Sequence, residues 1–238
     1  MKRSRDLLLV GCAVLALGGC GTVAGKPIPA ALPTTATTTS AVVEASNLAD
    51  REKAVRATFD DYKRAALAKD GEGAAGRVSW STAGYYGRAI PLALTAHAGE
   101  LRAAGPTFTM IAYALRAEFD AERLHTITSH SVVEVAVEKE LTGIYDLAAI
   151  ELTDVGLDGD RATAQFLFRG EPGGLTLHFV VEGVTWRFDL MSLIVQADGI
   201  VEAQARERNQ SLDEYVDTVI GGLYGVDRLP GLKRPLES

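Results

Sequence analysis

The stretch from Ile150 to Leu190 constrains the fold most, because apolar and polar residues alternate along three successive segments. A period of two is typical of strands that bury one face of a sheet. The apolar positions are Ala162, Ala164, Phe166 and Phe168, then Leu175, Leu177, Phe179 and Val181, and finally Val184, Trp186, Phe188 and Leu190. Turn sequences rich in glycine and acidic residues separate the segments. The sequence therefore predicts an antiparallel meander whose apolar face is covered by helices from elsewhere in the chain.

Helical periodicity of apolar residues dominates the rest of the chain. The first helix is expected from Asn47, which would cap it, to Gly71. The second is expected over 86–101, with a kink near Gly87 caused by Pro91. Further helices are expected over 105–119, 131–141 and 192–208, and from Ser211 to Gly225. In the third of these, Arg116 is expected on the solvated side. The valines of 131–141 also fit a strand, but Ser131 and Glu134 form a capping box that favours a helix.

Length and composition favour one folded domain. The chain has 238 residues, of which 47% are hydrophobic and 23% are charged, as in ordinary soluble domains. We predict a signal peptide over 1–19, a lipidated cysteine and tether over 20–46, a single α+β domain over 47–228, and a surface tail over 229–238. The tail contains two prolines and a glycine, which disfavour regular structure.

The amino terminus has the pattern of an export signal. Basic residues precede an apolar run over 7–17, which is shorter than the roughly 20 residues that cross a bilayer. The run ends in Leu17-Gly18-Gly19-Cys20, which resembles the lipobox of bacterial lipoproteins. The resemblance implies that Cys20 carries acyl chains such as palmitate and anchors the protein to the extracytoplasmic side of the cell membrane. An ordinary signal peptide cut elsewhere, with Cys20 incidental, is the alternative.

The residues after Cys20 are typical of a tether. The stretch 21–46 contains six threonines, six alanines and three prolines, too few large apolar side chains to form a core. It is a bare linker or an O-glycosylated one. Loss of the signal leaves 21 basic and 30 acidic residues, and hence a formal charge of −9. This charge disfavours nucleic acid as a partner, so membrane residence rests on the acyl chains.

No group of residues has the spacing of a catalytic or metal site. Both cysteines, Cys12 and Cys20, precede the folded domain, and the four histidines fit no zinc pattern. The aspartates around Gly159 lack the order of a calcium loop, and a polar hairpin turn explains them. His178 and Asp189 share the polar sheet face, as ordinary cross-strand neighbours do. We therefore predict no metal and no cofactor.

The meander and the helices before it resemble the nuclear transport factor 2 superfamily. The resemblance rests on Gly159-Asp160-Arg161-Ala162-Thr163-Ala164 and on the later strand centred on Trp186, and it covers 47–190. It implies a cone-shaped α+β fold, here with extra helices in an insert over 105–143 and at the carboxy terminus. The superfamily includes isomerases, dehydratases and cyclases as well as non-catalytic binding domains, and no position here matches their catalytic residues.

These observations favour a non-enzymatic, lipid-anchored envelope protein. Its partner would be a small apolar ligand or another envelope protein, bound in or beside the cone. The first alternative is an isomerase- or cyclase-like enzyme in which Tyr62, Tyr86 or His97 reaches a pocket. His97 is placed on the apolar stripe of the second helix, where a core or pocket role is commoner than catalysis. The second alternative is an envelope lipid carrier, which requires a large apolar cavity.

Overall fold

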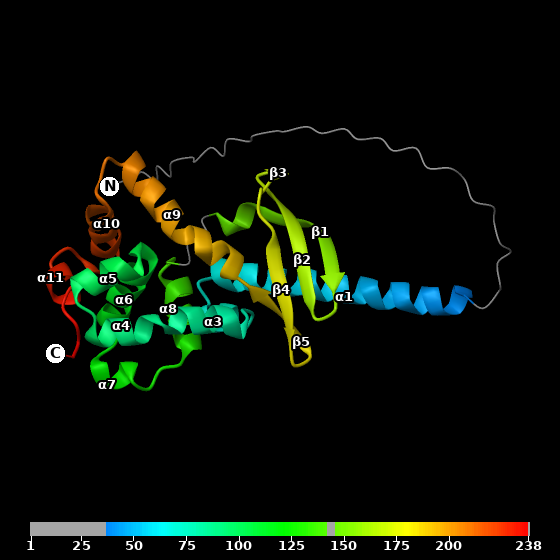
Figure 1. The fold of residues 1–238 in the computed structure, drawn as a ribbon, viewed down its shortest axis with the longest axis horizontal. Helices are drawn as coiled ribbons and strands as arrows, with labels where there is room; N and C mark the ends of the chain where they lie inside the picture. The colour runs from blue at the N-terminus through cyan, green and yellow to red at the C-terminus, as the bar shows by residue number, and fades with distance from the viewer. Residues whose placement is uncertain (1–36, 142–145, 238) are drawn as a thin grey trace.

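The computed structural model describes residues 37–141 and 146–237, and it shows an α+β protein in which a cluster of helices lies beside an antiparallel sheet (Figure 1). The helices are α1 (Thr37–Leu67), α2 (Gly71–Ala75), α3 (Trp80–Gly87), α4 (Ala89–Thr95), α5 (Ala98–Ala104), α6 (Pro106–Glu118), α7 (Ala121–Leu124), α8 (Ser129–Glu138), the 3-10 turn η1 (Leu147–Ala149), α9 (Met191–Glu207), α10 (Leu212–Tyr224) and α11 (Leu229–Leu232). The strands are β1 (Ile150–Asp158), β2 (Arg161–Phe168), β3 (Glu171–Pro172), β4 (Leu177–Glu182) and β5 (Thr185–Asp189).

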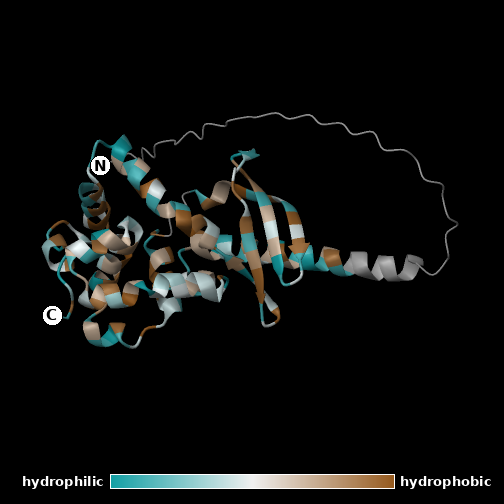
Figure 2. Ribbon diagram, viewed as in Figure 1, coloured by the Kyte–Doolittle hydropathy of each residue, from teal (hydrophilic) through white to brown (hydrophobic). Residues whose placement is uncertain are grey.

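The predicted meander is confirmed. The strands are antiparallel in the order β1-β2-β4-β5, and the short β3 pairs with β2. Tight turns at Gly159 and Gly183 join neighbouring strands, and both glycines have positive φ, which other residues rarely adopt. Apolar and polar residues alternate along the strands in Figure 2. The predicted inward residues Ala162, Ala164, Phe166, Leu177, Phe179, Trp186, Phe188 and Leu190 are buried. Phe168, Leu175 and Val181 are half-buried. Val184 contradicts the prediction, because it lies in the second turn and is fully exposed.

Helix α1 covers the apolar face of the sheet. Its side chains Phe59 and Tyr62 lie edge-on to Phe188 of β5, with ring centroids 5.6 and 5.2 Å away. The Phe188 ring also stacks on Phe179 of β4 at 5.1 Å. Aromatic pairs of this geometry add stability beyond the area that they bury. The predicted cover for the meander is therefore α1.

Both ends of α1 differ from the prediction. The helix begins at Thr37, so residues 37–46 of the predicted tether are helical and Asn47 lies in the helix interior, where it is no cap. The helix ends at Leu67, and Gly71 opens α2 instead. A Cβ at Gly71 would lie 2.7 Å from the carbonyl oxygen of Glu134. The glycine is thus needed for the close packing of α2 against α8, not for a helix end.

Both outer strands of the sheet are covered along their free edges. On the β1 side, Lys63 of α1 donates to the carbonyl of Ile150 at 2.6 Å, and Arg56 donates to the carbonyls of Leu152 and Thr153. On the β5 side, the segment 77–79 pairs with Phe188 through two backbone hydrogen bonds of 2.8 and 2.9 Å. The free edges thus already have hydrogen-bond partners within the chain.

Helix α6 is the centre of the helical cluster. It contacts α4, α5, α8, α9, α10 and α11, and every residue from Pro106 to Arg116 is buried. The expectation that α6 is solvated on one side, with Arg116 facing water, is therefore wrong. Helices surround α6 on all sides, which a single amphipathic stripe does not indicate.

The side chain of Arg116 is 5% exposed and binds four backbone carbonyls. Its guanidinium donates to Leu92, Ala93 and Ala96 at the end of α4, and to Leu232 in α11. The last carbonyls of a helix lack partners within it and carry partial negative charge. Burial lowers the pKa of Arg116 below its ordinary value, and these carbonyls stabilise the cation in place of a carboxylate.

The second predicted helix, over 86–101, is interrupted twice. The break expected near Gly87 is confirmed, since α3 ends there and α4 follows from Ala89. Pro91 lies in the first turn of α4, where its missing N–H is tolerated. A second break follows Thr95, and His97 is the exposed amino-terminal cap of α5. The placement of His97 on an apolar stripe is wrong, because the helix does not continue through it.

The later elements follow the sequence more closely. The helix predicted over 131–141 is confirmed in part, since α8 runs from Ser129 to Glu138. Thr128 caps it, so the predicted capping residue Ser131 lies inside the helix. Helix α9 is confirmed, and α10 has the predicted Ser211–Glu214 capping box and ends at Gly225 with φ 95°. The predicted surface tail packs more tightly than expected. It contains α11, and Leu232 is buried next to α6, where its carbonyl accepts from Arg116.

Candidate binding site between α6, α9 and α10

An apolar hollow of about 250 Å³ lies where α6, α9, α10 and the end of α8 meet. Its lining residues are Thr107 and Met110 from α6, Lys139, Glu140 and Leu141 after α8, Ala197 and Val201 from α9, and Tyr215, Val219, Gly222 and Leu223 from α10. Most of the lining is apolar, and the two charged residues come from the same short segment. Small-molecule sites have this composition, with few polar groups in an apolar wall.

The spacing between α6 and α9 at the hollow is fixed by Asp198. Its carboxylate accepts from the backbone N–H of Thr107 at 3.0 Å. This N–H lies in the first turn of α6, where it has no partner within the helix. A Cβ at Gly105 would lie 2.4 Å from the same carboxylate, and Gly105 has φ 103°. Only glycine fits at position 105, and the absence of a side chain there allows Asp198 to contact the start of α6.

The hydroxyl of Thr107 is the unusual polar group of the hollow. Thr107 is 5% exposed, and its Oγ1 has no hydrogen-bond partner among the described residues. By contrast, the hydroxyl of Thr109 donates to the carbonyls of Leu101 and Gly105 at 3.0 and 2.9 Å. A buried hydroxyl without a partner costs about 1–3 kcal/mol. The oxygen itself is enclosed by protein atoms, although Thr107 lines the hollow.

Gly222 is the second unusual feature, because it lies inside α10 without a packing reason. A Cβ at its neighbour Gly221 would lie 3.0 Å from Val226, so that position requires a small residue. A Cβ at Gly222 would meet nothing within 4 Å. Glycine inside a helix costs about 1 kcal/mol relative to alanine. The absence of a side chain at Gly222 keeps the hollow open.

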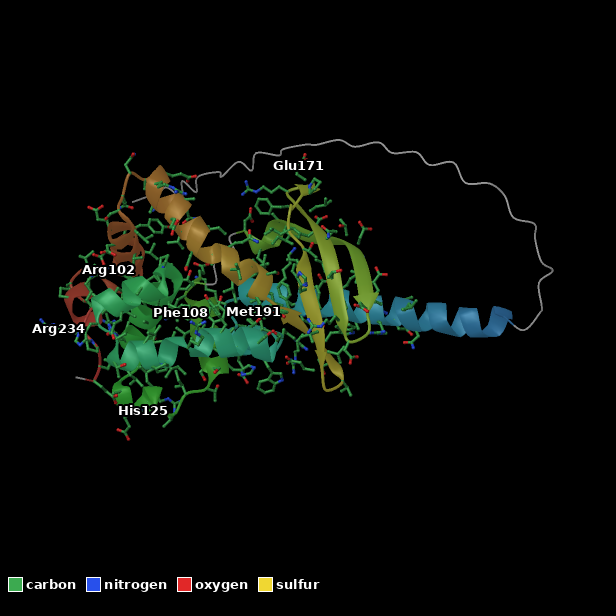
Figure 3. All side chains as sticks on the ribbon, viewed as in Figure 1. Arg102, Phe108, His125, Glu171, Met191 and Arg234 are labelled. Carbon is green, nitrogen blue, oxygen red and sulfur yellow. The ribbon has the colours of Figure 1, made fainter. Side chains whose placement is uncertain are left out.

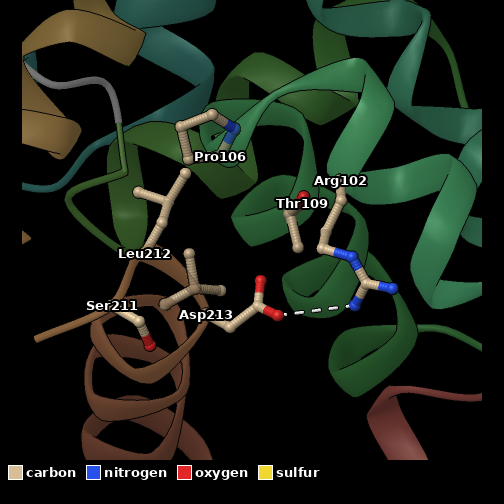
Figure 4. Close-up of a pocket in the computed structure, with 7 residues that line it drawn as sticks. Arg102, Pro106, Thr109, Ser211, Leu212 and Asp213 are labelled. Carbon is tan, nitrogen blue, oxygen red and sulfur yellow. Dashed lines mark hydrogen bonds and ion pairs between the residues drawn. The ribbon is translucent and has the colours of Figure 1, made fainter.

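A second hollow, of about 230 Å³, lies between α5, α6 and the start of α10 (Figure 4). The ion pair between Arg102 and Asp213, with 3.4 Å between Nη1 and Oδ2, crosses it. Both charged side chains are more than half exposed, and Ser211 already caps α10 there. This hollow offers no unpartnered buried group, so it is the weaker candidate.

None of the three predicted pocket residues lines either hollow. Tyr62 and Tyr86 are fully buried in the core. Burial raises the pKa of both phenols above the ordinary value, so they stay protonated. His97 is exposed at the start of α5. The core encloses the tyrosines and a helix break exposes the histidine, so the structure does not bring the three residues together at either hollow.

Asp189 and His125 make contacts that connect elements of the fold. Asp189 lies opposite His178 across β4 and β5, and its Oδ1 accepts from the hydroxyls of Ser81 and Thr82 at 3.3 Å each. These bonds join α3 to the end of β5. His125 contacts Glu237 at 2.6 Å, near the carboxy terminus and far from the sheet (Figure 3). Within 37–141 and 146–237, no three His, Cys, Asp or Glu residues come together as metal ligands would.

Cys20 and the predicted signal peptide lie outside the described residues. In the part of the chain that the structure describes, no helix combines the length and the apolar character that spanning a membrane requires. No protein-family model, curated protein or solved structure matches the chain.

Proposed function

We propose that this protein is an exported lipoprotein whose Cys20 acyl chains hold it on the extracytoplasmic side of the cell membrane. There it acts as a non-enzymatic binding domain that takes a small apolar group in the hollow between α6, α9 and α10. The observation that carries the proposal is the hollow itself, which has a mostly apolar lining and open space at Gly222. The export signal and the sequence Leu17-Gly18-Gly19-Cys20 support the location.

The size of the hollow limits the ligand. Its volume of about 250 Å³ is below the roughly 300–1,000 Å³ of drug-sized sites. It suits a short alkyl or aryl group, presented by a small molecule or by a side chain of another envelope protein. A whole diacyl lipid is much larger, so the hollow does not favour the lipid carrier. The tyrosines considered for catalysis are outside it, which favours binding over isomerase- or cyclase-like chemistry.

We also propose that the sheet and α1 form a cone of the nuclear transport factor 2 kind. The long helix across the apolar face of a four-stranded meander supports this assignment. In this view the helices between α1 and β1, together with α9 and α10, are additions to the cone. The binding hollow then lies entirely among the added helices, beside the cone and not inside it.

The replacement Gly222→Leu is expected to abolish ligand binding while leaving the fold intact. Leucine has room at this helical position and would project into the hollow. We expect 1-hexanol to give saturable NMR shifts at the methyl groups of Val201 and Val219 in the wild type. In the variant its affinity should fall by at least about tenfold, since a filled hollow admits no ligand.

The matched control is Gly199→Leu in α9, which also has no atom within 4 Å of its Cβ but does not line the hollow. This variant should bind 1-hexanol as the wild type does. Equal binding by the Gly222→Leu variant, or the absence of saturable shifts at these methyl groups in the wild type, would contradict the proposed site.

For the anchor, Cys20→Ala is expected to eliminate incorporation of an alkyne-labelled palmitate in cells. The thioether and amide that hold the acyl chains require the cysteine at this position. Cys12→Ala is the matched control, because Cys12 lies in the apolar run of the signal and its loss should leave labelling unchanged. In-gel fluorescence after coupling a dye to the alkyne measures both. Persistent labelling of the Cys20→Ala variant would refute the lipobox assignment.

A further inference from the structure

Two large apolar side chains are exposed together beside the turn between β4 and β5. Val184, in the turn, is 100% exposed, and Trp80, the first residue of α3, is 66% exposed. The backbone N–H of Trp80 donates to the carboxylate of Glu182 at 2.7 Å, which joins the start of α3 to the turn. In Figure 1, the turn between β4 and β5 extends farther from the sheet than the turn between β1 and β2. We call Trp80 and Val184 the tip pair.

Trp80 of the tip pair is held in place by contacts with α8 and β5 although it is exposed. The indole of Trp80 lies edge-on to the imidazole of His130 in α8, with ring centroids 5.1 Å apart. The preceding residue, Ser79, donates its backbone N–H to Phe188 of β5 at 2.9 Å. The segment before Trp80 is thereby fixed to the sheet, and the indole is fixed to α8. An exposed tryptophan that is ordered in advance loses little entropy when it meets another surface.

We propose that the tip pair inserts into the interface of the bilayer that carries the anchor at Cys20. This inference rests on the proposed lipidation. Tryptophan is enriched at the level of the lipid headgroups, because its ring is amphipathic. One tryptophan and one valine are far less than the roughly 800 Å² that each partner buries in a stable protein interface. They suffice for a shallow membrane contact, and the tether raises the effective concentration of the bilayer.

The chain between Cys20 and the domain is long enough for this contact. Thr58 of α1 lies next to β5, the strand that follows Val184, because its Oγ1 is 3.4 Å from the carbonyl oxygen of Trp186. From Thr37 to Thr58, α1 rises about 31 Å, at 1.5 Å per residue. The 17 residues from Cys20 to Thr37 reach up to about 56 Å when extended. The anchored domain can therefore fold back and place the tip pair on the membrane.

Brominated lipids test the contact, because bromine quenches only a tryptophan that lies in the bilayer. The lipidated full chain is reconstituted into phosphatidylcholine vesicles with plain or brominated acyl chains. We expect a roughly twofold drop in the emission of Trp80 with brominated lipid, as interfacial depth allows. The Trp80→Phe variant gives the background from Trp186, the other tryptophan, which is buried in the core.

Val184→Asp is expected to remove the quenching, because a carboxylate at the turn opposes insertion. The matched control is Val195→Asp, which changes a 79% exposed valine of α9 and should keep the quenching. Flotation of the vesicles reports the anchor separately. A chain that floats but shows equal emission in both lipids overturns the insertion, whereas a chain that does not float overturns the anchor and this inference with it.

Discussion

Replacing Arg116 by methionine is expected to lower the free energy of unfolding by about 3–5 kcal/mol, because several buried carbonyls lose a donor at a cost of about 1–3 kcal/mol each. Methionine fills a similar length but donates no hydrogen bond. The carbonyls of Ala93, Ala96 and Leu232 would lose the donor that Arg116 gives them, whereas that of Leu92 would keep the backbone N–H of Ala96. Each buried polar group left unpaired is costly. Urea denaturation followed by circular dichroism measures the change.

Two further variants show whether the hydrogen bonds of Arg116 cause the effect. Arg123→Met alters an exposed arginine of α7 and should change stability by less than about 0.5 kcal/mol. Arg116→Lys keeps the charge but not the planar fork of donors, so its loss should be intermediate. If the methionine variant is within about 1 kcal/mol of the wild type, the guanidinium does not hold α4 and α11 as described.

The second large effect is expected from Trp186→Ala, which should destabilise the protein by about 3–5 kcal/mol, as removal of large buried aromatics does. Trp186 is buried on the sheet face under α1, and the guanidinium of Arg51 lies 5.5 Å from its ring centroid. Its neighbour Arg187 points to the other face and donates to the carbonyl of Gly76 in an exposed hydrogen bond. Arg187→Ala should therefore cost less than about 1 kcal/mol. Similar denaturant midpoints for the two variants would mean that the faces of β5 are reversed.

The sheet was predictable because its signal is local. A period of two assigns each residue of β2, β4 and β5 to a face, and the glycines at 159 and 183 mark the turns between strands. Val184 continues the alternation by one residue into the turn, so the pattern places it inward although it is exposed. The helical capping box of α10 is equally local, since Ser211 and Glu214 contact each other within one turn.

The burial of helix α6 on all sides could not be predicted from a local sequence pattern. Thr109 and Arg116 are seven residues apart and share one face of the helix, which suggests a face toward water, yet both are buried. The acceptors that make burial of Arg116 tolerable belong to α4 and α11, and Leu232 is 116 residues away in the chain. Periodicity reports the polarity of a side chain, but not the backbone carbonyls that packing places around it.

The binding hollow escaped prediction for a related reason. Its walls come from helices far apart in the sequence, and periodicity assigns each apolar stripe to a core without showing where packing leaves space. The glycine pair 221–222 inside an apolar helix was the available signal, because a glycine there costs stability without a local gain. At His97, the helical period continues across the break between α4 and α5, so periodicity alone places this residue on an apolar stripe.

The covered edges of the sheet also restrict how another protein can bind. Many domains capture an extended peptide as an additional strand, which requires an outer strand with free backbone groups. Here a peptide would have to displace Arg56 and Lys63 from β1, or the segment 77–79 from β5. Recognition by strand addition is therefore disfavoured at both edges. A protein partner is expected to present a side chain or a helix to the surface of α9 and α10.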